Sequence, residues 1–154
     1  MPDPYFIYDD HEFQELAQGV VARAGNLQPA HEIVGEIVHA SIMRNFEKGG
    51  RPTAWTDLAD STKAQRTRKG TWPGQILVNS GVRGGLMGAV TYDAGPNRVV
   101  FLGNKPYAAI QHFGGPAGKG RKVQIPARPY FMIQDEDWDE IKAAINLFIF
   151  EVEA

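Results

Sequence analysis

The sequence feature that most constrains the fold is a periodic run that begins at Pro29 and ends at "EKGGRP". Apolar and small polar residues recur there at three- and four-residue spacing: Val34, Ile37, Val38, Ser41, Ile42, Asn45 and Phe46. That spacing places them on one face of an α-helix, and proline suits a first helical turn. The pattern therefore predicts a long helix whose apolar stripe packs into the core.

Helices are also predicted near both ends of the sequence. In "YDDHEFQELAQGVVARAGN", Asp9 and Glu12 have the spacing of a capping box, and Gly25 is a suitable stop for a helix over about 10–24. In "DEDWDEIKAAINLFIFEVEA" the acidic start favours a helix N-terminus. One face there carries Trp138, Ile141, Ile145 and Phe148. The last turn is too apolar for one stripe, so the helix either becomes a strand or is covered by another surface.

Between these helices, "GLMGAVTYD" alternates from Leu86 onward, and "AGPN" turns the chain into "RVVFLG". This pattern predicts a β-hairpin, which must lie against the helices because an isolated hairpin is marginally stable in water. A chain of 154 residues is long enough for one sizeable core. We therefore expect a single α+β domain over residues 1–154, with extended loops at about 49–74 and 114–131. The first loop carries one short helical pattern that Trp55 and Leu58 can anchor.

Composition excludes several functions. The formal net charge of −2 gives no global attraction to phosphate, and the absence of cysteine excludes disulfides, thiolate nucleophiles and cysteine-bound zinc. The first residues are acidic where a signal peptide is basic, and no apolar run approaches the ~18 residues that span a bilayer. We expect an unexported protein without a membrane partner.

No catalytic or metal-binding motif is found in the sequence. The four histidines form no H-x-x-x-H pair, and Ser80 lacks a nucleophile elbow. The carboxylates of Asp135, Glu136 and Asp137 are typical of a helix start rather than of an acid–base pair. The glycine-rich stretches lack the spacing of a phosphate-binding loop. We predict a protein that is not an enzyme and has no cofactor, with metal-dependent hydrolysis at His112 as a minor alternative.

Two segments are candidates for binding another macromolecule. The run "KAQRTRK" over 63–69 carries Lys63, Arg66, Arg68 and Lys69, which could contact DNA, although such runs are usually only solvated. In "IPARPYF", Pro126 and Pro129 remove two backbone donors and hold Arg128 extended, which favours an edge segment or an arm over a central strand.

The stretch "YAAIQHFGG" precedes this arm. Its first part predicts a short helix or turn with Ala108, Ala109 and Ile110 packed inward. Gly114 and Gly115 then release the chain into the basic segment that leads to "IPARPYF". We interpret His112, Gly114 and Gly115 as a structural hinge in which His112 hydrogen-bonds the backbone.

Four segments in this order resemble the phage virion morphogenesis family, the tail-completion or tail-terminator proteins of Mu-like phages. They are "RNFEKGGRPTAWTDLADSTKAQRTRKG", "ILVNSGVRGGL", "YAAIQHFGG" and "IPARPYFMIQDED". The resemblance covers roughly residues 35–150. The matching positions are Trp55, Leu58, Ser80, Gly81, Arg83, Tyr107, Ala108, His112, Gly114, Ile125, Pro126, Arg128, Pro129 and Tyr130.

The resemblance implies a structural virion protein that caps or completes the tail at its head-proximal end and mediates head–tail joining. It implies a homo-oligomeric ring of six subunits, with the tail tube protein and the head–tail connector as partners and only incidental DNA contact. A nucleic-acid-binding accessory protein that uses the 63–69 segment is the alternative.

For the ring we predict an assembly interface of Arg128, Tyr130, Phe131, Pro126, Pro129, Trp55, Arg66, Arg83, Phe148 and Phe150. Arginine and aromatic side chains are frequent anchors of interfaces. The alternative for Arg128 is a pair with an acidic residue of its own subunit, for instance near Asp135 or Glu136, that fixes the arm.

Overall fold

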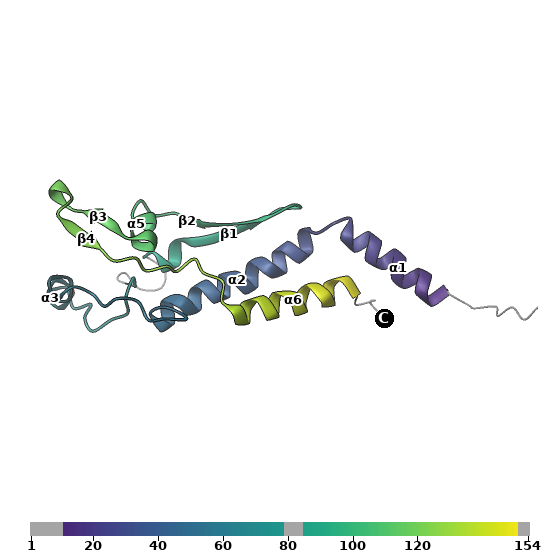
Figure 1. The fold of residues 1–154 in the computed structure, drawn as a ribbon, viewed down its shortest axis with the longest axis horizontal. Helices are drawn as coiled ribbons and strands as arrows, with labels where there is room; N and C mark the ends of the chain where they lie inside the picture. Colours follow the sequence, from purple (N-terminus) through teal and green to yellow (C-terminus); the bar gives the residue numbers. More distant parts are fainter. Residues whose placement is uncertain (1–10, 79–84, 151–154) are drawn as a thin grey trace, which may run out of the picture.

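The structure is a computed structural model that describes residues 11–78 and 85–150, with side chains from residue 14 onward. The described residues form α-helices and two small antiparallel sheets, so the predicted α+β class is confirmed (Figure 1). The helices are α1 (His11–Ala24), α2 (Gln28–Lys48), α3 (Asp60–Arg68), α5 (Ala108–Phe113) and α6 (Asp135–Phe150). The strands are β1 (Val90–Ala94), β2 (Val99–Gly103), β3 (Gly115–Ala117) and β4 (Val123–Ile125).

Helix α2 is the long helix that the periodic run predicts, and it runs through the middle of the molecule (Figure 1). It begins beside Pro29 and ends at Gly49, which has the left-handed φ of 68°. The N–H groups of Gly49 and Gly50 donate hydrogen bonds to the carbonyls of Phe46 and Asn45, respectively. These two carbonyls at the end of the helix would otherwise lack a partner.

Helix α6 lies beside α2, and α1 packs against α6 (Figure 1). The C-terminal segment stays helical through Phe150, so of the two alternatives the strand is wrong. Arg23 of α1 donates a hydrogen bond from Nη1 to the Ile149 carbonyl at 3.2 Å. Helix α1 has nearly the predicted bounds, whereas its predicted cap Asp9 lies outside the described residues.

The predicted hairpin is present, but its first strand starts four residues later than the alternation suggests. β1 pairs with β2 from Val90 opposite Gly103 to Ala94 opposite Val99. Before it, Met87–Ala89 form a 3-10 turn. Leu86 and Met87 are both buried, which a strand with a single buried face cannot achieve for successive residues because its side chains alternate between two faces.

The hairpin packs on α2 at a glycine. Gly35 is buried, and a methyl group at its Cβ position would lie 2.3 Å from the Tyr92 ring of β1. The missing side chain therefore lets the sheet approach the helix, which offsets the low helix propensity of glycine.

The core gathers around the C-terminal half of α2. Phe46 is fully buried, and its ring lies 5.9 Å from that of Trp55 and 5.1 Å from that of Tyr130. The Tyr130 hydroxyl donates a hydrogen bond to the Ala108 carbonyl at 3.2 Å, so the buried phenol is satisfied.

The two predicted long loops contain short elements. In the first, the helix α3 begins at Asp60, so the expectation that Trp55 and Leu58 lie on this helix is wrong. Trp55 is instead buried in the core, where its ring packs against that of Phe46. In the second, β3 and β4 pair from Gly115 opposite Ile125 to Ala117 opposite Val123. We call residues 114–131 the arm.

None of the described helices has the length and apolarity needed to cross a bilayer.

Candidate functional site

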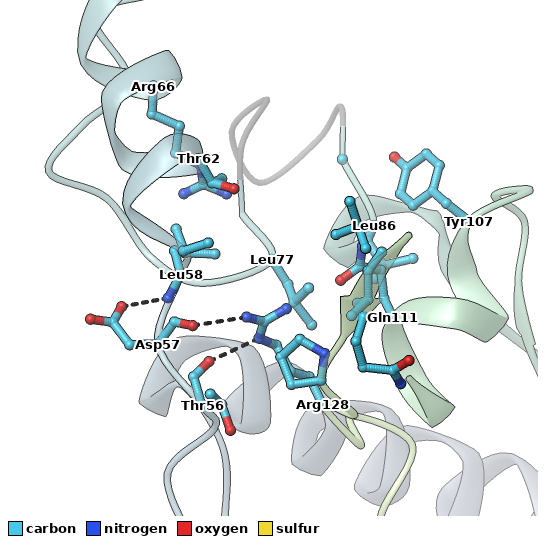
Figure 2. Close-up of a pocket in the computed structure, with 16 residues that line it drawn as sticks. Thr56, Asp57, Leu58, Thr62, Arg66, Leu77, Leu86, Tyr107, Gln111 and Arg128 are labelled. Carbon is cyan, nitrogen blue, oxygen red and sulfur yellow. Dashed lines mark hydrogen bonds between the residues drawn. The ribbon is translucent and has the colours of Figure 1, made fainter. Parts of the chain in front are cut away.

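The arm lies across from the segment that leads into α3, and a cleft of about 560 Å³ separates them (Figure 2). One wall is formed by Thr56, Asp57, Leu58, Ala59, Thr62 and Arg66. The opposite wall and floor are formed by Leu77, Gly85, Leu86, Tyr107, Gln111, Val123, Gln124, Ile125, Pro126 and Arg128. The cleft therefore joins all four of the segments that carry the sequence motifs.

Arg128 connects the two walls. Its Nε donates to the Thr56 carbonyl at 3.0 Å and its Nη2 to the Asp57 carbonyl at 3.1 Å (Figure 2). The side chain is buried. The alternative that placed its ion pair near Asp135 or Glu136 is wrong, because the guanidinium is held by backbone carbonyls and Glu136 pairs with Arg51 at 2.5 Å. Burial lowers the pKa of Arg128, which the nearby Asp57 charge partly offsets and the Arg66 charge reinforces.

Arg66 occupies the α3 side of the same cleft. It is buried, and its Nη1 donates to the Gln75 carbonyl at 2.8 Å. Burial lowers the pKa of this guanidinium too. Among the described residues, no carboxylate lies within ion-pair distance of Arg66 or Arg128.

The other cations of the 63–69 run have two different surroundings. Lys63 pairs with Asp57 at 2.6 Å and lies over the Trp72 ring, 5.6 Å from its centroid. The hydrogen bond to Lys63 lowers the pKa of Asp57, and the same bond raises that of Lys63. Arg68 and Lys69 are exposed. The basic run therefore offers fewer cations to solvent than its sequence suggests.

Trp55 of the first loop and Tyr130 of the arm belong to the core. Trp55 donates from Nε1 to the Pro129 carbonyl at 3.2 Å, and Tyr130 is almost fully buried. Phe131 packs against the core while partly exposed. Pro126 lines the cleft. Of the remaining predicted interface residues, Arg83 lies outside the described residues.

His112 fixes the return of the arm. Its Nδ1 accepts the backbone N–H groups of Tyr130 at 3.3 Å and Phe131 at 3.4 Å, so the predicted hydrogen bond to the backbone is confirmed. Burial lowers the pKa of His112, which favours the neutral ring that such acceptance requires. Ala108 is buried as predicted, whereas Ala109 is exposed because it lies on the outer side of α5.

The two glycines of the predicted hinge adopt backbone conformations that favour glycine. Gly114 has a φ of 71° and Gly115 a φ of 141°, both in the region that favours glycine. A Cβ at Gly114 would lie 2.6 Å from the Ala127 nitrogen. Across the same junction the Arg128 N–H donates to the Gln111 carbonyl at 2.9 Å. The two ends of the arm therefore lie in close contact with each other.

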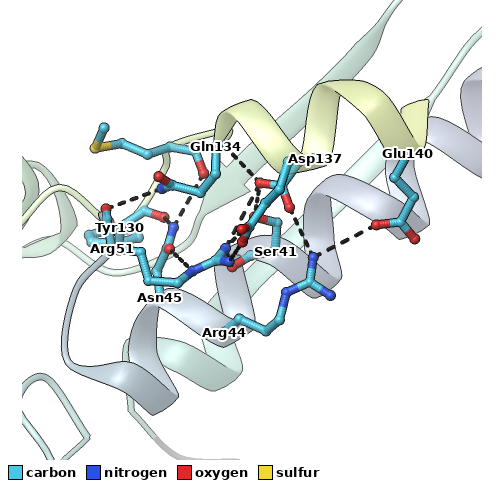
Figure 3. Close-up of polar contacts among 10 residues, drawn as sticks. Ser41, Arg44, Asn45, Arg51, Tyr130, Gln134, Asp137 and Glu140 are labelled. Atoms are coloured by element: carbon cyan, nitrogen blue, oxygen red, sulfur yellow. Dashed lines mark hydrogen bonds and ion pairs between the residues drawn. The ribbon is translucent and has the colours of Figure 1, made fainter. Parts of the chain in front are cut away.

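A buried polar network joins α2 to the start of α6 (Figure 3). The carboxylate of Asp137 is fully buried and accepts hydrogen bonds from the Ser41 hydroxyl, from Arg44 at 2.9 Å and from the Gln134 N–H at 2.7 Å. The sequence placed Asp137 among the carboxylates of a helix start. The spacing Gln134 to Asp137, that of the returning half of a capping box, is the signal that could have identified it.

Asn45 links the same network to the arm. Its amide nitrogen donates to the carbonyls of Tyr130 at 2.9 Å and Met132 at 3.2 Å. Its amide oxygen accepts from Arg51 Nε at 2.9 Å (Figure 3). One turn of α2 therefore holds the arm, the loop after α2 and the start of α6.

Exposed apolar side chains occur on elements at two different ends of the elongated molecule (Figure 1). Beside the cleft are Tyr107, Phe113 and Val123, of which Phe113 is 76% exposed. On α1 and α6 are Val21, Leu147 and Phe150, and Phe150 is 59% exposed. We call these the arm end and the helix end. Phe148 is half-buried at the helix end.

Comparison with known proteins identifies the family. The phage virion morphogenesis family matches residues 8–148, and the chain belongs to this family. It is 37% identical over 128 residues to "Mu-like prophage FluMu G protein 2" of Haemophilus influenzae, which covers 83% of this chain and 79% of that protein. It is 34% identical over 111 residues to "Putative capsid assembly protein G" of Escherichia phage Mu, covering 70% of this chain and 69% of that one. No solved structure matches the chain.

Membership of this family makes the chain a phage virion morphogenesis protein. In the part of the chain that the structure describes, no cluster of three histidine, aspartate or glutamate residues could hold a metal ion.

Proposed function

We propose that the protein is a tail-completion or tail-terminator subunit that assembles into a ring of six at the head-proximal end of the phage tail. The family relationship supports a role in virion morphogenesis. The observation that favours a ring is the presence of exposed apolar side chains at both the arm end and the helix end. Exposed apolar side chains that lie together on a surface are typical of interaction sites.

A ring requires two different, complementary surfaces on each subunit, because each contact joins one patch to another patch on the next copy. The arm end and the helix end are two such different surfaces, and we propose that they are the ones that meet. They lie on separate elements, α5 with the β3–β4 arm and α1 with α6, and each carries an aromatic side chain that is mostly exposed. Contact of one end with the other closes a ring when the rotation between copies divides a full turn.

Within this proposal the predicted interface residues act in two ways. Arg128, Trp55 and Tyr130 are buried and hold the arm in position. Phe150 is exposed at the helix end and is available to a neighbouring subunit. The tail tube protein and the head–tail connector remain the proposed partners of the assembled ring.

The experiment is complementation of a lysogen that lacks the gene, followed by negative-stain imaging of the lysate. The variant Phe113→Ser removes an exposed apolar anchor without opening the core, and we expect complete heads beside tails that do not join them. Leu102→Ser on β2 is the matched control, since Leu102 is 45% exposed but lies outside both ends. Normal infectious particles from Phe113→Ser would contradict the role of the arm end.

A role in capsid assembly is the second candidate, because the phage Mu relative carries the name "Putative capsid assembly protein G". The same deletion separates the two functions. Loss of a capsid assembly factor gives missing or malformed heads beside normal tails, whereas loss of a tail protein leaves the heads intact.

The nucleic-acid-binding alternative depends on the 63–69 run. It predicts an affinity for DNA that falls steeply with salt. Because Arg66 is buried and Lys63 is paired with Asp57, a gel-shift assay at low salt is expected to show no DNA binding.

A further inference from the structure

The cleft beside the arm holds two cationic side chains that lack a counter-ion among the described residues. Arg66 is 7% exposed and Arg128 is 5% exposed, and both line the cleft. Burying a cation without an opposite charge costs free energy. The carboxylate of Asp57, whose charge acts on Arg128, is already bonded to Lys63 and to the Leu58 N–H. A carboxylate brought from outside would compensate the two guanidinium groups.

The remaining surface of the cleft is largely apolar. Leu58, Leu77, Val123, Ile125 and Pro126 line it, and each is at least partly exposed. A phosphate backbone would match the charge but would leave this apolar lining in water. The occupant that fits both parts is a peptide in which a carboxylate stands close to aromatic or aliphatic side chains.

The chain itself contains such a segment outside the described residues. Its first eight residues read "MPDPYFIY", in which Asp3 stands between two prolines and is followed by Tyr5 and Phe6. Proline fixes its own φ, and a segment with fewer accessible conformations loses less entropy on docking. The segment therefore offers one carboxylate and an apolar group at low ordering cost.

This segment cannot reach the cleft of its own subunit. It precedes α1, whereas α3 and β4, which contribute to the lining of the cleft, lie beyond the other end of α2, and α1 points away from them (Figure 1). The 14 residues of α1 and the 21 residues of α2 are about 21 Å and about 31 Å long. Ten extended residues span at most ~36 Å, which is less than α2 and most of α1 together.

We infer that residues 1–8 of one subunit dock in the cleft of a neighbouring subunit. The Asp3 carboxylate lies against Arg66 and Arg128, and Tyr5 and Phe6 cover the apolar lining. This inference rests on the proposed ring, in which the helix end of one copy faces the arm end of the next. At each contact in the ring, one subunit would then place its first residues in the cleft of its neighbour.

Because the chain has no cysteine, the contact can be tested by disulfide crosslinking of full-length protein. A variant with Ile7→Cys is mixed with a variant with Val123→Cys, whose side chain lines the cleft and is 58% exposed. After mild oxidation we expect a covalent dimer of the two variants. Leu102→Cys replaces Val123→Cys in the matched control and should give only the background yield. Equal yields would overturn the inference.

The charge part of the inference is tested in the segment, where a substitution does not disturb the core. Adding Asp3→Asn to the Ile7→Cys chain should lower the yield of the dimer severalfold, whereas Asp10→Asn should leave it unchanged. An unchanged yield with Asp3→Asn would contradict the role of the two arginines. A disulfide formed within one chain that carries both cysteines, without dimer, would contradict docking between copies.

Imaging of the same uncrosslinked samples separates this inference from the proposed function. Rings without a specific crosslink would overturn the segment exchange and leave the ring intact. A specific crosslinked dimer without rings would support the exchange and contradict the ring.

Discussion

At the scale of single residues, the most consequential side chain is that of Asp137. Burial alone would raise the pKa of its carboxyl, but hydrogen bonds from Ser41, Gln134 and Arg44 outweigh that effect and hold the pKa below its usual value. The charged form is therefore the one that the fold stabilises. Arg51 stands close by, at 3.9 Å, and shares in the compensation of this buried charge.

We predict that Asp137→Asn lowers the free energy of unfolding by about 3 kcal/mol. The substitution removes the negative charge that the buried part of Arg51 and the Ser41 hydroxyl face in the folded protein. Denaturant unfolding followed by tryptophan fluorescence measures the change. Asp139→Asn is the control, since that side chain is exposed and pairs only with Lys142 on the surface. Its stability should be within about 0.5 kcal/mol of the wild type.

The pKa of His112 leads to a prediction about pH. Burial lowers this pKa below the ordinary value of 6.5. As the pH falls, His112 therefore takes up a proton in the unfolded chain at a higher pH than in the folded protein. The contribution of the neutral ring is complete above 6.5 and is lost as the pH falls toward the folded pKa. We expect His112→Gln to remove this part of the fall in stability between about pH 7 and about pH 5.

Unfolding in denaturant at several pH values in that interval measures the slope. His39→Gln keeps the His112 ring and its bonds to Tyr130 and Phe131, so it should keep this part of the slope. A slope in His112→Gln that equals that of the wild type would show that the imidazole does not titrate as described.

At the scale of elements, the contact of α2 with the hairpin depends on one missing side chain. A Cβ at Gly35 would lie 2.3 Å from the Tyr92 ring, so the ring or the whole hairpin would have to move. In α1, by contrast, the nearest side-chain atom to a Cβ at Gly19 is Arg23 Nη1 at 4.0 Å. The two glycines occupy similar helical settings but differ in what stands over them.

Gly35→Ala should therefore destabilise the protein by about 2 kcal/mol, although alanine favours helices, because overpacking outweighs propensity. Gly19→Ala should leave the fold unchanged and stabilise it by up to about 1 kcal/mol. Thermal unfolding of both variants gives the comparison. Stabilisation by both substitutions would mean that Tyr92 can move aside at little cost.

The elements that could be predicted from the sequence are those whose signal is local. The spacing from Val34 to Phe46 predicts α2, and its stop at Gly49 follows from residue type alone. The start of β1 could not be predicted in this way, because the burial of Leu86 and Met87 depends on how the turn meets the core. The position of Trp55 outside α3 has the same cause, since its partners Phe46 and Pro129 come from other segments.

The same distinction between local and tertiary signals applies to the candidate site. His112 as a backbone acceptor at the hinge follows from a lone histidine beside two glycines. The cleft does not follow, because its lining comes from residues within 56–66 and 107–128 and from Leu77, Gly85 and Leu86, which only the tertiary fold brings together. Arg128 illustrates the limit: its partners are the carbonyls of Thr56 and Asp57, and carbonyls are not distinguished by sequence.

At the scale of the whole molecule, the separation of the arm end from the helix end determines how copies can associate. If each contact joins one end to the other, a subunit with a damaged arm end still offers a sound helix end. The reverse holds for a subunit with a damaged helix end. Two differently damaged subunits can therefore form one contact, but they cannot continue the chain of contacts.

We predict that Phe113→Ser and Phe150→Ser are each unable to form rings, and that their mixture gives dimers and no larger species. Mass photometry of the separate and mixed proteins measures this. Rings restored in the mixture, or dimers formed by each variant alone, would indicate a contact that joins like surfaces.

The single turn of α2 around Asn45 also has a mechanical consequence. Through Asn45 the carbonyls of Tyr130 and Met132 are tied to α2, and through Arg51 and Asp137 the same turn is tied to α6. A tension applied to the arm would load these hydrogen bonds together and pass to α2 and α6. In a virion, such a subunit would transmit force from one neighbour to the next through its helices.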